Sequence, residues 1–302
     1  MCESHRPMDT LAECPVCDSA DLGLRCFGRT TRNPSDPAEW RVAECRSCGL
    51  GFLNPRPSWQ ELEPYYSAQY AAYSHSHGAK ADDEAVIAEA RRTGRFRHIP
   101  IPEGKRVLDV GCGGGYFLRI CSKLGATVQG IEPSPIAAEQ TRSQGIPVHY
   151  GMIDTLTTRM RYDVITASQV LEHAPDPVAM LAKMRLLLAP GGMIWLAVPN
   201  ADCCWAKVLG WKWDGADLPY HLLHFGSRSM ETAAKRAGLS IARLYTHSKP
   251  SIVAFSYRTY LRNRYGVPKK LSALVVTPER VAAMGRRMDA QNVGDTLITE
   301  LT

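Results

Sequence analysis

Short apolar runs alternate with amphipathic stretches from residue 105 onward. Each run is typical of a buried strand, and each stretch repeats apolar side chains at helical spacing. Strands are expected at 107–110, 127–131, 148–150, 162–167 and 193–198, with helices between them at 115–124, 134–144 and 178–188. Because strands that alternate with helices form a parallel sheet covered on both faces, we predict an α/β fold with a doubly wound sheet.

The chain on either side of this alternation follows other patterns. Upstream, we expect strands at 22–27 and 40–45, an aromatic-rich helix at 60–73, a polar linker at 74–78 and a charged helix at 82–98. Downstream, the pattern predicts helices at 227–237, 251–264 and 278–289 and strands at 239–247 and 295–301. The charged helix at 82–98 is expected to lie across the ligand cleft of the central sheet.

Composition narrows the class of protein without giving a function. The chain has 302 residues, 45% hydrophobic and 22% charged, which is ordinary for one large globular domain and a smaller one. Its net charge is +6, and the short basic stretches 258–264 and 269–270 are interpreted as a solvated face, which disfavours a nucleic-acid partner. The sequence shows neither a signal peptide nor a membrane-spanning run, so we expect a cytoplasmic protein without a membrane partner.

Two C-x-x-C pairs near the N-terminus point to a metal. Cys14 and Cys17 form the first pair, Cys45 and Cys48 form the second, and 27 residues separate them. Together they offer four thiolates, the tetrahedral set that Zn²⁺ prefers. Four cysteines leave no open position for water, so we predict a structural zinc ribbon, with Cys26 outside the ligand set. A ribbon surface that also grips substrate is the functional alternative.

A glycine-dense turn follows the first strand of the alternating region. Gly111, Gly113, Gly114 and Gly115 allow a ligand to lie against bare backbone at the start of a helix, beside Asp109 at the end of the strand. The turn lacks the Gly-Lys-Ser/Thr of a phosphate-binding loop. It also lacks the third glycine of the dinucleotide pattern, because Tyr116 stands at that position.

Polar residues and short motifs also occur at the ends of the later predicted strands. Glu132 ends the second strand, where a carboxylate can accept hydrogen bonds from both ribose hydroxyls of a nucleoside. An enzyme that uses NAD could place a carboxylate there too. The segments 163–177 and 188–200 add Asp-Val-Ile-Thr-Ala, Gln-Val-Leu-Glu-His and Ala-Pro-Gly-Gly in sequence.

These segments together resemble the class I S-adenosylmethionine (SAM)-dependent methyltransferases over roughly residues 105–238. They also resemble a narrower group in which an N-terminal zinc ribbon precedes the methyltransferase domain, including sugar C-methyltransferases and other small-molecule methyltransferases. The resemblance implies a Rossmann-like sheet whose antiparallel final strand inserts between neighbours already in the sheet. We therefore expect a zinc ribbon at 1–57, a helical linker and cofactor lid at 58–98, and a methyltransferase domain at 99–302 with a helical insertion near 250–290.

The resemblance also implies which residues hold the methyl donor. Asp109, Gly111 and Gly113 would cradle the methionine part of SAM, and Glu132 its ribose. Met152 and Ile153 would flank the adenine, although many relatives have an acidic residue near position 152. Gln169 would lie beside the methionine or the sulfonium. The remaining predicted donor-binding residues are Cys112, Tyr116 and Pro133.

Candidate bases for methyl transfer are histidines, whose pKa lies nearest neutral pH. His173 follows the fourth strand, and His221 and His224 lie in Tyr-His-Leu-Leu-His-Phe, a segment that the resemblance places at the acceptor pocket. Tyr220 stands there in place of the arginine usual in that group. His221 and His224 could face one way in a helical turn, and either a base or a brace for the loop fits them. For His173, bracing is the preferred interpretation.

The leading interpretation is an enzyme that transfers methyl from SAM to a small-molecule acceptor in biosynthesis, such as a sugar, a nucleotide-sugar or a natural-product intermediate. O-, N- and C-transfer remain open. The alternative is an RNA or protein methyltransferase whose zinc ribbon holds its substrate. Against it, no Asn/Asp-Pro-Pro-Tyr signature follows the fourth strand. A SAM- or zinc-binding scaffold without activity is the third possibility, and the intact donor motif disfavours it.

Overall fold

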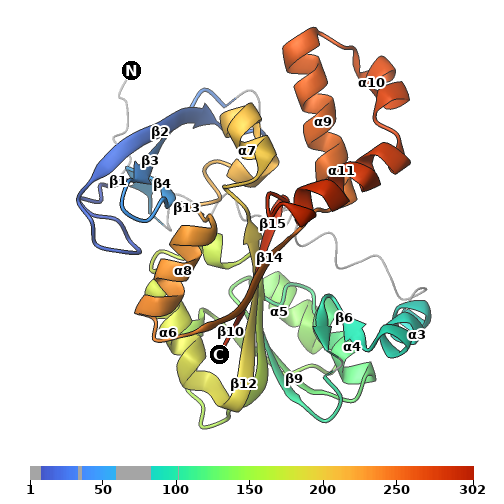
Figure 1. The fold of residues 1–302 in the computed structure, drawn as a ribbon. Helices are drawn as coiled ribbons and strands as arrows, with labels where there is room; N and C mark the ends of the chain where they lie inside the picture. The colour runs from blue at the N-terminus through green and yellow to red at the C-terminus, as the bar shows by residue number, and fades with distance from the viewer. Residues whose placement is uncertain (1–7, 33–35, 59–82, 101) are drawn as a thin grey trace.

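A seven-stranded sheet forms the centre of the computed structural model, which describes residues 8–32, 36–58, 83–100 and 102–302 (Figure 1). Its strand order is β10-β9-β8-β11-β12-β15-β14, and only β15 runs antiparallel to its neighbours. The strands are β8 (Arg106–Val110), β9 (Thr127–Glu132), β10 (Val148–Tyr150), β11 (Tyr162–Ser168), β12 (Leu188–Pro199), β14 (Ile241–His247) and β15 (Thr296–Leu301). The predicted sheet is confirmed, and β15 inserts between β12 and β14 as expected.

Helices cover both faces of this sheet. One side carries α3 (Asp83–Thr93), α4 (Tyr116–Lys123) and α5 (Pro135–Arg142), and the other carries α6 (Pro177–Leu187) and α8 (Ser227–Arg236) (Figure 1). Two of these helices begin at side-chain caps, because Ser134 and Asp176 accept hydrogen bonds from backbone N–H groups of the first turn. Short 3-10 turns follow the strand ends at η3 (Ile153–Thr155) and η4 (Leu171–His173).

The N-terminal segment forms a separate small sheet. Its order is β13-β4-β3-β2, from β2 (Leu22–Arg29), β3 (Glu39–Cys45), β4 (Gly51–Leu53) and β13 (Leu223–His224). Two further two-stranded pairs join β1 (Met8–Asp9) to β5 (Arg56–Pro57) and β6 (Arg95–Phe96) to β7 (Ile99–Pro100). The strand β13 comes from the predicted acceptor segment, so a segment far along the chain completes the N-terminal sheet.

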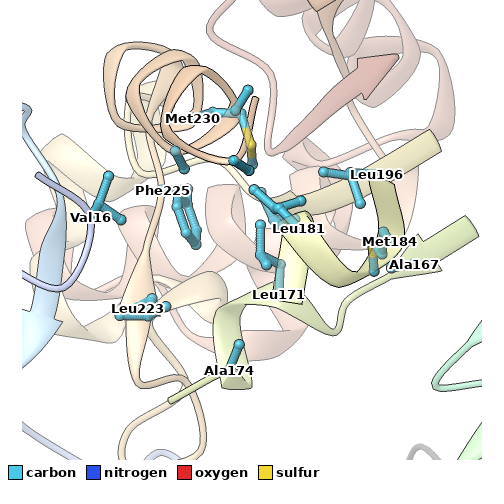
Figure 2. Packing of buried hydrophobic residues seen from close by; sticks show 14 of the residues in the cluster. Val16, Ala167, Leu171, Ala174, Leu181, Met184, Leu196, Leu223, Phe225 and Met230 are labelled. Carbon is cyan, nitrogen blue, oxygen red and sulfur yellow. The ribbon is translucent and has the colours of Figure 1, made fainter. Parts of the chain in front are cut away.

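One hydrophobic core joins the N-terminal sheet to the central sheet. Figure 2 shows Val16 of the first cysteine turn on one side of Phe225, and Met230 of α8 and Leu181 of α6 on the other. Phe225, Val16, Met230 and Leu181 have no exposed surface. Burial of this kind contributes roughly 25 cal/mol per Å² of apolar surface, so each segment depends on the other for its stability.

A helical arm occupies the chain between β14 and β15. It consists of α9 (Pro250–Tyr265), α10 (Lys269–Val275) and α11 (Pro278–Ala290), and it stands away from the sheet (Figure 1). The base of the arm packs on α7 (Cys204–Leu209) and the turns η5 (Gly210–Lys212) and η6 (Asp214–Ala216) that follow it. The sequence pattern indicated α9 and α11 but not α10.

Two local predictions are wrong. The helix expected at 82–98 ends at Thr93, because Gly94, Arg97 and His98 all adopt positive φ and turn the chain into the β6–β7 pair. His221 and His224 do not share a helical turn, since His224 lies in the strand β13. The helix expected at 60–73 and the linker at 74–78 lie outside the described residues. Among the residues that are described, no helix is long and apolar enough to cross a membrane.

Candidate functional site

The loop between β8 and α4 forms a bare backbone surface at the carboxyl edge of the sheet. Gly111, Gly113 and Gly115 have φ of 72°, 54° and 81°, a backbone conformation that residues with a Cβ rarely adopt. A Cβ on Gly113 would meet no atom within 4 Å, so this position borders open space. A Cβ on Gly111 would lie 2.5 Å from Val170 Cγ2, so this glycine is required by packing. The loop therefore has room for a ligand at Gly113.

Side chains at the end of α5 and in the turn that follows it fix the shape of the loop. Thr141 Oγ1 donates to the Gly113 carbonyl at 2.7 Å, and Gln144 Nε2 donates to the Gly114 carbonyl at 2.7 Å. These bonds satisfy carbonyls that the loop cannot pair with itself. The glycine loop is therefore already shaped without a ligand.

Glu132 lies at the end of β9 beside this loop. Its Oε2 accepts the Gly113 N–H at 2.8 Å and its Oε1 accepts the Ser134 N–H at 2.9 Å. A carboxylate has about four lone-pair sites, so each oxygen can accept one further hydroxyl. Burial raises the pKa of Glu132, whereas the two N–H groups lower it. Its position and remaining acceptor capacity fit a ribose diol.

Asp109 is the second buried carboxyl of the donor side. Thr166 Oγ1 on β11 donates to Asp109 Oδ1 at 2.6 Å. Burial raises the Asp109 pKa to about 7, while Thr166 and the Arg97 charge lower it. Arg97 lies over the Tyr116 ring at 5.4 Å, with its charge close enough to act on Asp109. The methionine end predicted for this place carries both an ammonium and a carboxylate, and Asp109 and Arg97 offer the opposite charges.

The other predicted donor residues lie around the same edge with different exposure. Cys112 packs against Gly130 of β9, where an added Cβ would lie 2.5 Å from its sulfur. Met152 is 46% exposed and Ile153 is buried at η3. Gln169 adopts φ of 59°, and its Nε2 donates to the Ala197 carbonyl at 3.3 Å. Tyr116 begins α4, and Pro133 follows Glu132 directly.

The end of β11 leads from the donor side to a buried polar cluster. Val170, which contacts the glycine loop, stands two residues before Glu172. Ligand atoms of Glu172, His173 and His221 lie within 4.8 Å of one another. Glu172 is 1% exposed, and neither of its oxygens has a hydrogen-bond partner among the described residues. Such a carboxyl is costly to bury, so it indicates a site built for a ligand.

Each histidine of the cluster has one nitrogen fixed by a backbone carbonyl. His173 Nδ1 lies 2.7 Å from the Tyr220 carbonyl, and His221 Nδ1 lies 2.9 Å from the Gly215 carbonyl. A carbonyl can only accept, so Nδ1 carries the proton and Nε2 of the neutral ring carries the lone pair. His221 Nε2 lies 3.9 Å from Glu172 Oε1 and 3.7 Å from Asp217 Oδ2.

Burial sets the protonation of this cluster. It raises the Glu172 pKa to about 8, so this carboxyl is largely neutral at neutral pH. Burial and the neighbouring His173 lower the His221 pKa to about 3, and burial lowers that of His173 as well. The cluster therefore offers a neutral carboxyl as a donor and neutral imidazole nitrogens as acceptors.

The loop after β2, the first strand of the N-terminal sheet, reaches this cluster through an ion pair. Arg32 Nε donates to Asp217 Oδ1 at 2.7 Å, its NH2 group contacts Oδ2, and its guanidinium lies 3.9 Å from the centre of the Tyr220 ring. Asp217 is held at φ of 32°, where its carboxylate faces His221. A planar guanidinium suits this two-point contact. A residue near the N-terminus thus fixes a charge beside the acceptor-side histidine.

His224 has a bracing geometry. It is 5% exposed, its Nε2 lies 2.9 Å from the Ala216 carbonyl, and it pairs with Gly51 of β4. Burial lowers its pKa to about 4. The structure therefore separates the two histidines: His221 faces the polar cluster, and His224 lies in the strand that joins the two sheets.

The four predicted metal ligands converge at the end of the N-terminal sheet. Cys14 Sγ lies 3.6 Å from Cys48 Sγ, and Cys17 Sγ lies 3.4 Å from Cys45 Sγ. Zn–S bonds of about 2.3 Å in a tetrahedron would place the sulfurs roughly 3.8 Å apart, which is close to this spacing. A disulfide would need about 2.05 Å. The thiol set fits Zn²⁺, and Cys26 lies outside it.

Sequence reasoning missed the residues that act across long separations. Arg97 was placed inside an expected helix, and Arg32 and Asp217 carried no motif at all. Thr166 lies in an apolar strand, and nothing in the local sequence predicts its hydrogen bond to Asp109. Glu172 belongs to a segment that the sequence did single out, at the end of the fourth strand, but only its neighbour His173 was expected to be a site residue.

Comparison with known proteins gives the family. Residues 83–244 match the family described as "Methyltransferase domain". The ubiquinone biosynthesis O-methyltransferase of Haemophilus ducreyi is 36% identical over 109 residues, which cover 32% of this chain and 46% of that protein. The corresponding enzyme of Histophilus somni is 33% identical over 148 residues, covering 45% and 60%. The chain thus spans about half the length of the curated relatives it matches.

A solved structure supports the fold. It is a complex of the Haloferax volcanii Trm112 methyltransferase activator with a methyltransferase, and the matching chain is 19% identical with a TM-score of 0.53, covering 80% of this chain and 96% of its own length. At this identity the likeness concerns the fold alone. Since the family match covers more than half of the residues, the chain belongs to the methyltransferase-domain family.

Proposed function

We propose that this protein transfers a methyl group from SAM to a small-molecule acceptor. The observation that carries the proposal is the pairing of Glu132 with Gly113 at the strand ends, beside the open space at that glycine. The residues fit the donor: Glu132 would bind the ribose, and Asp109 and Arg97 the methionine end. Met152 and Ile153 would flank the adenine. When bound, SAM supplies a methyl group activated by a positive sulfur.

The acceptor side is proposed to be the cluster of Glu172, His173 and His221. The glycine loop and this cluster meet at Val170, so an acceptor in the cluster would face the methionine end of the donor. Alignment of the two reactants and exclusion of water supply much of the rate in such a transfer. Glu172 and His221 are buried and His173 is half-buried, which suits that task.

The geometry favours a hydroxyl as the accepting group. Neutral Glu172 can donate a hydrogen bond to the acceptor oxygen, and His221 Nε2 can accept the hydroxyl proton. As the oxygen–carbon bond forms, the sulfur–carbon bond of the donor would break with the neutral thioether as leaving group. The hydroxyl proton passes to Nε2, and the resulting imidazolium faces the Asp217 carboxylate 3.7 Å away. Because burial holds the His221 pKa near 3, the histidine orients the hydroxyl and takes the proton only during transfer. The O-methyltransferase names of the curated relatives support a hydroxyl acceptor.

The zinc is proposed to be structural. Four thiols fill a tetrahedral shell, and the ribbon would be too small to fold on its own core. We also infer that residues 1–57 form the ribbon, 58–98 the linker and 99–302 the methyltransferase domain. The nine described cysteines are free thiols, which supports the expected cytoplasmic location.

Release of S-adenosylhomocysteine (SAH) tests the proposed function. Purified protein is incubated with SAM and a panel of catechols, sugars, nucleotide-sugars and amines, and SAH is quantified. We expect turnover with a hydroxyl acceptor and a rate about 100-fold lower after Glu172→Leu, which removes the hydrogen-bond donor. Turnover only with amines, or only with RNA or protein, would contradict the assignment.

A further inference from the structure

The helical arm carries the whole excess of positive charge in this protein. Residues 250–290 contain eight basic and two acidic side chains, a difference equal to the net charge of +6 for the complete chain. The rest of the sequence is therefore balanced. The basic residues of the arm are Arg258, Arg262, Arg264, Lys269, Lys270, Arg280, Arg286 and Arg287. None of them forms an ion pair with another described residue.

Large apolar side chains are exposed among these charges. Leu274 is 75% exposed, Tyr265 64% and Leu271 54%. All three lie at the far end of the arm, where α9 ends and α10 begins and where Lys269 and Lys270 are also exposed. No acidic residue occurs between 250 and 278. A surface that is both cationic and apolar matches the headgroup and acyl boundary of an anionic lipid layer.

The arm starts at the same edge of the sheet as the proposed site. β14 runs antiparallel to β15, which runs antiparallel to β12, so β14 points the same way as β12, β11 and β8. Its final residue, His247, thus lies at the carboxyl edge that also carries Asp109 and Glu132. The arm is anchored there, since Lys249 N–H donates to Asp295 Oδ2 at 3.0 Å and Ser248 N–H donates to Asp289 Oδ2 at 3.0 Å.

We propose that the tip of this arm, residues 262–274, docks the protein on an anionic lipid surface. Basic side chains would contact lipid phosphates, while Leu271, Leu274 and Tyr265 would enter the boundary below them. Attachment at this edge would hold the proposed site next to acceptors carried by the lipid layer, an inference that rests on the proposed function. The expectation of no membrane partner rested on the lack of a spanning segment, and surface attachment needs none.

The exposed leucines favour lipid over nucleic acid. A nucleic acid binds cationic side chains through its phosphates and aromatic rings through stacking, but it offers an exposed aliphatic side chain little to contact. An anionic lipid layer binds cationic side chains at its headgroups and aliphatic side chains at its acyl boundary. The same reasoning predicts two separable losses: charge reversal weakens binding to anionic lipid only, and removal of the leucines weakens binding that remains at high salt.

Vesicle co-sedimentation tests the proposal with the full chain. Vesicles of phosphatidylglycerol and phosphatidylcholine are compared with phosphatidylcholine alone at low and physiological salt. We expect at least tenfold tighter binding to the anionic vesicles. Lys269→Glu with Lys270→Glu should abolish this preference, and Leu271→Ser with Leu274→Ser should reduce binding at physiological salt about tenfold.

A matched control reverses the same amount of charge outside the arm. Arg159→Glu with Arg161→Glu changes two exposed basic residues in the loop before β11 and should leave vesicle binding unchanged. SAH binding, measured on every variant, reports whether the fold and donor site are intact. It also separates failure of this inference from failure of the proposed function.

Three results would overturn the inference. The first is equal binding of wild-type protein to neutral and anionic vesicles. The second is an equal loss of binding in the Arg159/Arg161 control. The third is binding of single-stranded RNA that falls with the Lys269/Lys270 variant while vesicles remain unbound.

Discussion

The proposed donor side and the proposed acceptor side of the site are built in different ways. The donor side comes from one continuous stretch, in which the glycine loop and Glu132 belong to neighbouring strands and bond directly through Gly113. The acceptor side gathers Glu172, His221 and Asp217 from separate segments, and Arg32 reaches it from the N-terminal sheet. Local geometry therefore fixes the donor site, whereas the acceptor site depends on how distant segments pack together.

Because of this contrast, damage to the proposed zinc ribbon should affect the two sides differently. The ribbon shares a buried core with α6 and α8, and its sheet is completed by β13 of the acceptor segment. It does not contribute to the glycine loop or to Glu132. Damage to the ribbon should thus disturb the acceptor side first when the fold survives, and the whole molecule when it does not.

The largest effect is expected from removing zinc ligands. Cys14→Ser with Cys17→Ser should prevent metal binding, which contributes roughly 10–16 kcal/mol in zinc-finger peptides, and should unfold the ribbon and expose the core around Val16. We expect an insoluble protein or a fall in Tm of more than about 10 °C. Cys26→Ser, in the same sheet but outside the ligand set, is the matched control. A double variant with unchanged Tm and metal content would refute the zinc site.

The next largest effect concerns the donor side. Glu132→Ala removes the acceptor for two loop N–H groups and for the proposed ribose hydroxyls. Losing two charge-assisted hydrogen bonds should weaken SAM binding about 100-fold, at roughly 1.4 kcal/mol for each factor of ten. Equilibrium dialysis with labelled SAM measures this. Glu139→Ala, on the exposed side of α5, should bind SAM normally, and equal affinities for the two variants would show that Glu132 has no donor role.

Glu172→Leu, which removes the hydrogen-bond donor, separates the two sides. SAM affinity should be unchanged, while the rate of methyl transfer at saturating acceptor should fall about 100-fold. The folded pKa of Glu172 is raised to about 8 from its usual 4.5, so the folded state binds the proton more tightly. Wild-type stability should then decline as pH rises from about 4.5 to 8, and Glu172→Gln, whose amide does not ionise, should decline less. Chemical denaturation at pH 5, 6.5 and 8 checks this, and identical pH profiles would argue against a buried neutral carboxyl.

Arg32→Ala should give the smallest effect. The loss of the Arg32 charge leaves Asp217 free to attract a proton to His221, so the His221 pKa should rise. We expect a KM for the acceptor about tenfold higher, with SAM affinity unchanged. An NMR titration of the His221 ring reports the pKa directly. Arg29→Ala, which loses only an exposed contact with Glu39, is the control, and an equal shift in both variants would mean that the ion pair does not position His221.

The central sheet could be predicted because each of its strands and helices has a local sequence pattern. The apolar run at 107–110 and the caps Ser134 and Asp176 act over a few residues, so periodicity and turn residues suffice. The prediction of a helix at 82–98 was wrong at its end, where Arg97 and His98 adopt positive φ. Arginine and histidine give no sequence signal for that conformation. The strand β13 in the acceptor segment was not predicted for a different reason. It forms only by pairing with β4, which lies far away in the chain.

A crystal structure with SAH, measured at the zinc absorption edge, tests the central claim most directly. We predict the SAH ribose within hydrogen-bond distance of Glu132, its sulfur facing the cluster of Glu172 and His221, and an anomalous peak between Cys14, Cys17, Cys45 and Cys48. SAH bound elsewhere, or a cysteine cluster without a metal peak in protein purified without chelator, would contradict the account.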